Sequence, residues 1–256
     1  MLLKTFEWGN PDGPTLVCIH GVGGSHAMFR KIVEERWGKI FRVITFDLRG
    51  HGESVWDPPW NNATYVADII DTIDHLGIDE ADWVGVSFGG RLLLQVLAYH
   101  PERVRRACAL EPVIQASPEL CRRRALEELK GGEWDSLEDF FASRGAAAGD
   151  ADPEEYLQEY AAEFERLPDG RVRRNTFQPA IVSIFSEQAA PSPPPETITK
   201  PTMILYAPAF GLVTPEQRAA YEPYVERFVE VPGSHAVFVT AFDETATAVE
   251  EFLTAD

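Results

Sequence analysis

The sequence contains a serine in a glycine-flanked turn, which is a setting for nucleophilic chemistry. Residues 85–89 read Gly-Val-Ser-Phe-Gly, with an apolar run, Asp82–Val86, before the serine and a helical pattern, Arg91–Tyr99, after it. A tight strand-to-helix turn of this kind presents the serine hydroxyl at the end of a sheet. Because a hydroxyl is a poor nucleophile until a base takes its proton, Ser87 needs a histidine partner. The chain offers six histidines.

Two further glycine-rich segments also follow strand-like apolar runs. Residues 20–24 read His-Gly-Val-Gly-Gly, and residues 47–54 read Asp-Leu-Arg-Gly-His-Gly-Glu-Ser. With the serine turn, these segments resemble the motifs of the α/β-hydrolase fold family, in the family's order. The resemblance extends to His235 and covers almost everything outside residues 113–200. One departure is the short N-terminus, since the family often has two strands before the His-Gly strand.

The resemblance implies roles for a base and for two backbone groups. His235 lies after the last strand candidate, where the family places its catalytic base; the alternative is a histidine in a surface loop. The N–H groups of Val22 and Phe88 occupy the positions of the family's oxyanion hole. Developing negative charge needs such preorganised donors, and loss of one typically costs ~10²–10³ in rate.

The resemblance assigns the other histidines differently. His20 and His51 lie where the family uses the ring to brace loops, and His75 and His100 lie in or at the end of predicted helices. We expect structural roles for these four. His26 lies near the predicted oxyanion loop, so it could line the pocket, but a base there would approach from the wrong strand.

A serine–histidine pair of this kind is completed to a catalytic triad by a carboxylate, and here the position of that carboxylate departs from the family's usual one. Most family members place an aspartate after the penultimate strand, but here residues 207–215 contain no carboxylate and Gly211 stands at about that place. The chain resembles serine esterase- and lactonase-like members with the acid after the sixth strand, which favours Glu111. A carboxylate at the end of a buried strand is costly without a partner. Glu111 would then orient His235 and stabilise its protonated form.

Alternatives to Glu111 remain open. Glu111 could instead pair with an arginine such as Arg91 or Arg123. Glu216 follows Thr214-Pro215 and is better explained as a first-turn helix residue, and Asp243 is a helix-cap candidate.

Short apolar runs alternate with longer helical patterns, which predicts an α/β fold with a mostly parallel central sheet and helices on both faces. Residues 1–112 and 201–256 form the predicted core. Residues 113–200 break the rhythm and are predicted as an inserted helical cap, with helices at Pro118–Lys130 and Pro153–Leu167 and a stiff proline-rich end. The strand candidates are Leu3–Trp8, Thr15–Ile19, Arg42–Phe46, Asp82–Val86, Val104–Leu110, Thr202–Tyr206 and Arg227–Val231.

Composition limits the partners. The formal net charge of −18 disfavours nucleic acid and anionic membrane surfaces. No signal-peptide or membrane-spanning pattern is visible, and three scattered cysteines do not suggest disulfides, so we expect a cytoplasmic protein, monomeric or homodimeric. No phosphate-binding glycine motif or metal-spaced cluster is present, so we expect no cofactor and no metal.

A serine at the turn argues against haloalkane dehalogenase and epoxide hydrolase activity, which in the family use an aspartate nucleophile, and favours acyl transfer to water. We therefore predict a serine hydrolase of the carboxylesterase or lactonase type, acting on a small neutral or apolar ester. Alternatives are a carbon–carbon bond (diketone) hydrolase on the same triad, and a ligand receptor with little turnover. Aromatic residues of the insertion could line the pocket or pack the cap onto the core: Trp134, Phe140, Phe141, Phe177 and Phe185.

Overall fold

The computed structural model describes residues 1–144, 154, 157–158 and 161–255, and is built around one seven-stranded sheet. The strand order is β1-β3-β2-β4-β5-β9-β10, with β1 antiparallel to β3 and the other neighbours parallel. The predicted mostly parallel sheet is therefore confirmed. Its strands are β1 (Thr5–Gly9), β2 (Thr15–Ile19), β3 (Arg42–Phe46), β4 (Ala81–Val86), β5 (Val104–Leu110), β9 (Thr202–Tyr206) and β10 (Arg227–Glu230).

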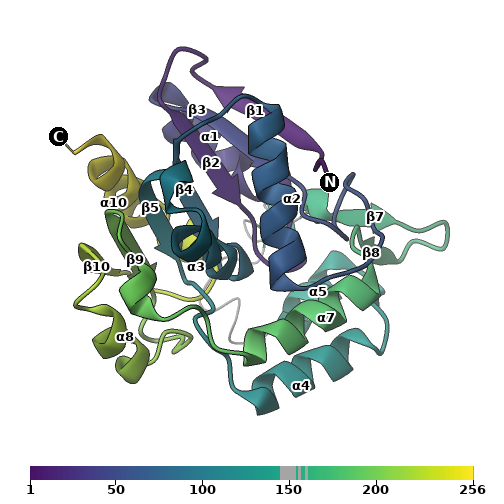
Figure 1. Cartoon of the computed structure of the whole chain (residues 1–256). Coiled ribbons are helices and arrows are strands. Elements are labelled where there is room, and N and C mark those ends of the chain that lie inside the picture. The colour runs from purple at the N-terminus through teal and green to yellow at the C-terminus, as the bar shows by residue number, and fades with distance from the viewer. Residues whose placement is uncertain (145–153, 155–156, 159–160, 256) are drawn as a thin grey trace.

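Helices cover both faces of this sheet, as predicted, and create two separate cores. Successive strand residues point to opposite faces, so Val17 and Ile19 join one core while Leu16 and Cys18 join the other. In Figure 1, α2 and α3 lie in front of the sheet, over the first core. Helices α1 and α10 contribute to the second core. The helices outside residues 113–200 are α1 (Arg30–Glu35), α2 (Asn62–His75), α3 (Phe88–Tyr99), α8 (Pro215–Tyr221), α9 (Val237–Thr240) and α10 (Phe242–Thr254).

Short 3₁₀ helices complete the connections at His26–Phe29, Trp37–Lys39, Pro101–Arg103, Ala161–Glu163 and Pro195–Thr197. Side-chain caps mark the starts of α2 and α8. The side chain of Asn61 accepts a hydrogen bond from Thr64 N–H at the start of α2, and Thr214 forms a capping box with Gln217 at the start of α8. Glu216 therefore lies in the first turn of α8, as the sequence indicated.

The inserted segment is only partly helical, which corrects the prediction of a helical cap. Helices α4 (Pro118–Glu128), α5 (Leu137–Arg144) and α7 (Gln178–Ala189) gather at one end of the central sheet (Figure 1). A small antiparallel sheet accompanies them, in the order β6-β8-β7. Its strands are β6 (Glu133–Trp134), β7 (Phe164–Arg166) and β8 (Val172–Arg174).

The predicted helix Pro153–Leu167 is wrong at its described end. Residues 161–166 form a 3₁₀ turn and β7, while 153, 155–156 and 159–160 lie outside the described residues. The missed signal is Pro168-Asp169-Gly170, which turns the chain between β7 and β8; Leu167 N–H donates to Arg171 O at 2.8 Å. Asp-Gly is a favoured pair in the tight turn of a hairpin.

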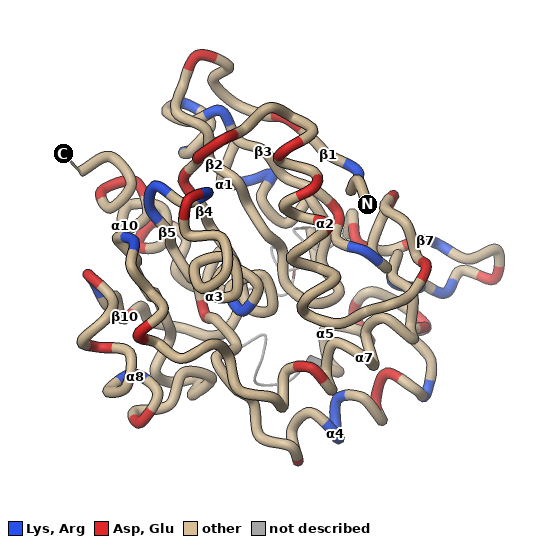
Figure 2. Tube along the Cα trace, viewed as in Figure 1, with Lys and Arg blue, Asp and Glu red and all other residues tan. Residues whose placement is uncertain are grey.

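Acidic residues are scattered over many elements rather than gathered in one patch (Figure 2). Within the described ranges, no helix is both long and apolar enough to cross a membrane.

Candidate active site

The serine turn joins β4 to α3 in a strained conformation. Ser87 has φ 56° and ψ −115°, outside the region that residues with a side chain normally occupy. The flanking glycines are required by close approach. A Cβ on Gly85 would lie 2.4 Å from Gly89 O, and one on Gly89 would lie 2.1 Å from Ile19 O. The turn therefore depends on small residues, and it holds the serine at the end of the sheet.

The structure brings the three predicted triad side chains together. His235 Nε2 lies 3.0 Å from Ser87 Oγ, and His235 Nδ1 lies 3.3 Å from Glu111 Oε2. The contacts join residues 148 and 124 positions apart in the chain. The Phe210 ring stacks on the imidazole, with centroids 5.0 Å apart. The arrangement can pass a proton between serine and histidine while a carboxylate faces the other ring nitrogen.

Glu111, like Ser87, is buried and has an unusual backbone conformation. It follows β5, is fully buried and has φ 46°. Ser87 and Glu111 are the two non-glycine residues with positive φ among those described, and such strain collects at functional sites. The second carboxylate oxygen accepts a short hydrogen bond from Ala207 N–H. Residues after β9 therefore position this acid, although they supply no carboxylate of their own.

The alternative arginine partners of Glu111 are wrong. Arg91, on α3, is fully buried and donates to the carbonyls of Val113, Ile114 and Ala190. These carbonyls lie at the two ends of the inserted segment, so one guanidinium ties both ends to the helix that follows Ser87. Arg123 is largely exposed and lies 3.9 Å from Glu127.

Asp243 is also remote from His235. Its carboxylate is 86% exposed and accepts a hydrogen bond from Arg36 on the surface. The structure therefore leaves Glu111, of the acids considered, in contact with the histidine.

Two backbone N–H groups lie close to Ser87. Phe88 N–H belongs to the first turn of α3, where a helix has no acceptor of its own for such groups. Val22 follows Gly21, whose close approach would place a Cβ 3.1 Å from Ser87 Cβ. Val22 also lines the same cavity as Ser87 and His235. These placements suit the expected pair of oxyanion donors.

His51 braces the loop that carries Val22. Its Nε2 accepts from Gly23 N–H at 3.1 Å, and its Nδ1 lies 3.0 Å from Arg49 O. This pairing fits a neutral ring with the proton on Nδ1. Burial, aided by the neighbouring His20, lowers the pKa of His51 to about 3. The ring is therefore a fixed neutral support at ordinary pH.

His20 contacts the segment after β3 and the glycine before Val22. Its Nε2 accepts from Leu48 N–H at 2.9 Å, and its Nδ1 lies 2.7 Å from Gly21 O. Burial lowers the pKa of His20 as well. The structural role that we expected for His20 and His51 agrees with these contacts.

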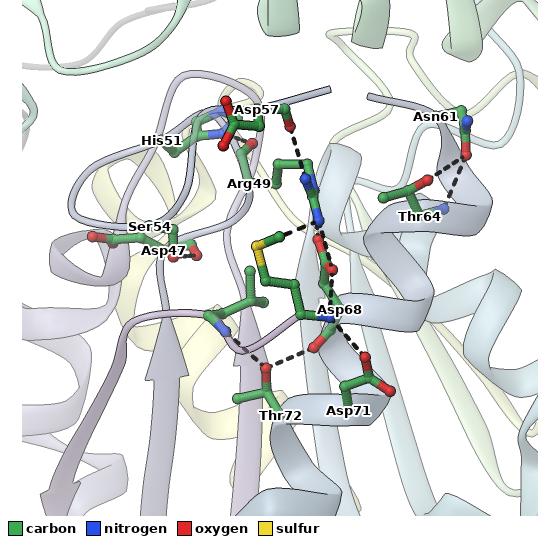
Figure 3. Close-up of polar contacts among 12 residues, drawn as sticks. Asp47, Arg49, His51, Ser54, Asp57, Asn61, Thr64, Asp68, Asp71 and Thr72 are labelled. Carbon is green, nitrogen blue, oxygen red and sulfur yellow. Dashed lines mark hydrogen bonds and ion pairs between the residues drawn. The ribbon is translucent and has the colours of Figure 1, made fainter. Parts of the chain in front are cut away.

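A polar network lies behind this loop (Figure 3). Arg49 forms a bidentate pair with Asp68 of α2, at 2.7 and 2.9 Å, and donates to Asp57 O. Asp47 is buried and accepts from the N–H groups of His26 and Glu53. Although burial opposes it, these bonds and the His26 ring hold the pKa of Asp47 below its usual value.

A cavity of about 100 Å³ lies over Ser87 and His235. Of the aromatic residues expected at the pocket, Phe185 lines it, while Trp134 lines a neighbouring cavity. Phe140 is buried in a small cluster with Ala236, and Phe141 packs against that cluster. Phe177 packs on the rings of Trp56, which is exposed, and Trp60, which is partly buried. The cavity over Ser87 is also lined by residues that no sequence pattern indicated: Phe210, Leu212 and the α4 residues Leu120, Cys121 and Arg124.

Among the described residues, no group of three or more His, Cys, Asp or Glu side chains could hold a metal ion. His75 lies in the last turn of α2, and the His100 ring lies 3.8 Å from Glu102. Neither lines the cavity over Ser87.

A family model described as the alpha/beta hydrolase fold matches residues 14–180. The chain is 26% identical over 196 residues to the lipase LipV of Mycobacterium tuberculosis, covering 76% of this chain and 74% of the lipase. It is 38% identical over 98 residues to a 2-hydroxymuconate semialdehyde hydrolase of a Pseudomonas species, covering 37% of this chain and 35% of that protein.

Solved structures extend the similarity to the whole chain. The enol-lactonase from Burkholderia xenovorans LB400 has a TM-score of 0.81 at 24% identity, covering 99% of this chain and 96% of that one. At this level of identity the similarity describes the fold alone.

Proposed function

We propose, from the premise that this chain belongs to the α/β hydrolase fold family, that it is a serine hydrolase cleaving a carboxylic ester or lactone. The observation that carries the proposal is the contact of His235 Nε2 with Ser87 Oγ at 3.0 Å, on a turn where the serine has φ 56°. The similarity to the lipase LipV supports a hydrolase.

In the first half of the proposed reaction, Ser87 Oγ attacks the substrate carbonyl carbon and its proton passes to His235 Nε2. The N–H groups of Val22 and Phe88 stabilise the oxyanion of the tetrahedral intermediate. The C–O bond to the leaving alkoxide then breaks, and the alkoxide takes the proton from His235. An acyl-enzyme on Ser87 remains.

The second half reverses the roles with water. His235 takes a proton from a water molecule, whose oxygen attacks the acyl carbon. The acid product forms as the bond to Ser87 Oγ breaks, and that oxygen recovers the proton from His235. Glu111 keeps the proton of Nδ1 in place and stabilises the imidazolium during both halves.

The test is hydrolysis of p-nitrophenyl butyrate together with labelling by a serine-directed fluorophosphonate. We expect turnover and rapid modification of Ser87, located by peptide mass spectrometry. Labelling without ester turnover would favour another acyl-transfer reaction on the same residues. No labelling and no turnover would contradict the proposal.

The second candidate is hydrolysis of a carbon–carbon bond in a diketone. It is favoured by the local match to the 2-hydroxymuconate semialdehyde hydrolase. The two candidates differ in the bond that breaks, so product analysis with an ester and with a diketone of similar size separates them. A ligand receptor is less well supported, because its basis was the missing acid at Gly211 and Glu111 lies 3.3 Å from His235.

A further inference from the structure

The cavity over Ser87 has an almost wholly uncharged wall. Val113, Ala116, Leu120 and Leu212 line it together with the rings of Phe185 and Phe210. Among the described residues, Arg124 is the one permanently charged side chain in that wall. A guanidinium beside apolar surface favours an anionic partner, because the low local dielectric strengthens the attraction.

Arg124 has hydrogen-bonding capacity to spare. A guanidinium carries five N–H donors. Within the described part of the chain, its recorded partner is Glu127, which accepts from Nη1 at 3.0 Å. Glu127 is 45% exposed and is shared with Arg123, so this is a surface ion pair of the kind that holds a side chain weakly.

Arg124 lies on the same helix, α4, as other residues of the cavity wall. Leu120 and Cys121 line the cavity, and Arg124 lies one turn further on the same helix face. A second cavity, of about 460 Å³, shares Val22, Arg124 and Phe185 with the first. Arg124 therefore lines both the space over Ser87 and the neighbouring space, whose wall also includes Glu127, Glu128 and Glu133.

We propose that Arg124 is a specificity-determining residue that binds a carboxylate at the end of the substrate remote from the scissile bond. The substrate class is then an ester or lactone bearing one carboxylate, such as a monoester of a dicarboxylic acid. The planar guanidinium matches a carboxylate in bidentate geometry. Arg124 provides local attraction in a chain whose net charge of −18 otherwise repels anions. This inference rests on the proposed function.

The test compares charged and neutral esters of matched length. The monomethyl esters of succinic, glutaric and adipic acid are assayed beside methyl butyrate, methyl pentanoate and methyl hexanoate, by proton release. We expect the wild type to prefer at least one monoester of a diacid. Arg124→Gln should lower kcat/KM for that substrate about 10- to 100-fold, mainly through KM, because a hydrogen-bonded charge is lost. The matched neutral ester should change little.

Two variants control for charge and folding. Arg123→Gln removes the same charge from the adjacent, exposed position and should leave both substrate classes unchanged. Arg124→Lys keeps the charge but loses the bidentate geometry, and should fall between the wild type and Arg124→Gln. A wild type that prefers every neutral ester, or an Arg124→Gln that slows both classes equally while Arg124→Lys does the same, would overturn the inference.

Calorimetric titration with glutarate and adipate separates this inference from the proposed function. Ester turnover without preference for the charged substrates, and without diacid binding, would leave the hydrolase and remove the anion site. Diacid binding by the wild type but not by Arg124→Gln, with no ester hydrolysed, would keep the anion site and contradict the hydrolase. Neither binding nor turnover would contradict both.

Discussion

The molecule contains two histidine–carboxylate pairs that are alike in most respects. His235 lies against Glu111 and His26 lies against Asp47, each through Nδ1, at 3.3 and 2.8 Å. Both carboxylates are buried, while the two histidine side chains are 24% and 19% exposed. Each imidazole also stacks on a phenylalanine, Phe210 for His235 and Phe6 for His26.

The pairs differ in what surrounds them. Nε2 of His235 faces Ser87 Oγ, whereas the recorded polar contacts of His26 within the described residues all go to Asp47. The carboxylate of Asp47 also accepts Glu53 N–H and so joins two loops. Glu111 has a strained backbone and Asp47 does not. We therefore propose that the serine beside His235, rather than the histidine–carboxylate contact alone, distinguishes a catalytic pair from a structural one.

The largest expected effect is at the nucleophile that distinguishes the two pairs. Ser87→Ala should lower kcat for p-nitrophenyl butyrate by ~10⁵–10⁶, because no group remains for His235 to activate. Thermal unfolding should stay near that of the wild type. A variant with more than about a hundredth of wild-type activity would show that Ser87 is not the nucleophile.

Removing the charge of Glu111 should have the next largest effect. Glu111→Gln should lower kcat by ~10³–10⁴ with little change in KM, because the imidazolium loses its carboxylate and its tautomer is no longer enforced. Steady-state kinetics at several pH values measure this. If the variant stays nearly as active as the wild type, Glu111 is not the acid that orients His235.

The matched change in the other pair should act on stability. Asp47→Asn weakens hydrogen bonds to a buried charged acceptor and should lower the free energy of unfolding by about 2–3 kcal/mol. Urea denaturation measures the loss, and kcat/KM should stay within about tenfold of the wild type because Ser87 is untouched. A loss of activity as large as that of Glu111→Gln, without a loss of stability, would contradict a structural role for the pair of His26 and Asp47.

The smallest expected effect is on the pH dependence of stability, and it comes from His51, which supports the loop that carries Val22. The pKa of His51 is about 3 in the folded chain and near 6.5 when unfolded, so only the unfolded chain gains this proton between those values. Its contribution is present above pH 6.5 and is lost as the pH falls, by about 2 kcal/mol at pH 5. His51→Gln should therefore show a smaller loss of stability than the wild type between pH 7 and pH 5.

The difference between the two proteins is the quantity to measure, because Asp82 acts with the opposite sign. Burial raises the pKa of Asp82 to about 6, so the folded chain binds its proton more readily and gains stability as the pH falls below 6. Asp82 is present in both proteins, and its contribution cancels. Equal pH dependence in the wild type and in His51→Gln would contradict the assignment of His51.

The sequence by itself determined the strands, the order of the motifs and a short set of candidates. Ser87, Glu111 and His235 each follow a strand. Such a local pattern can be recognised from the sequence without knowing which distant residues are in contact. Asp169-Gly170 could have predicted the hairpin between β7 and β8. The helix-like composition of the preceding residues led instead to the prediction of a helix.

Only the tertiary structure decided which distant groups meet. The contacts of His235 span 148 and 124 residues, so they depend on the strand order of the central sheet and on where each loop leaves it. The same is true of Arg91. The sequence left it open as a partner of Glu111, but in the folded chain it donates to backbone carbonyls. Arg124 carried no motif, and its place beside the cavity follows from how α4 packs against α7. Local propensity acts over a few residues, whereas pairing and burial are properties of the assembled sheet and helices.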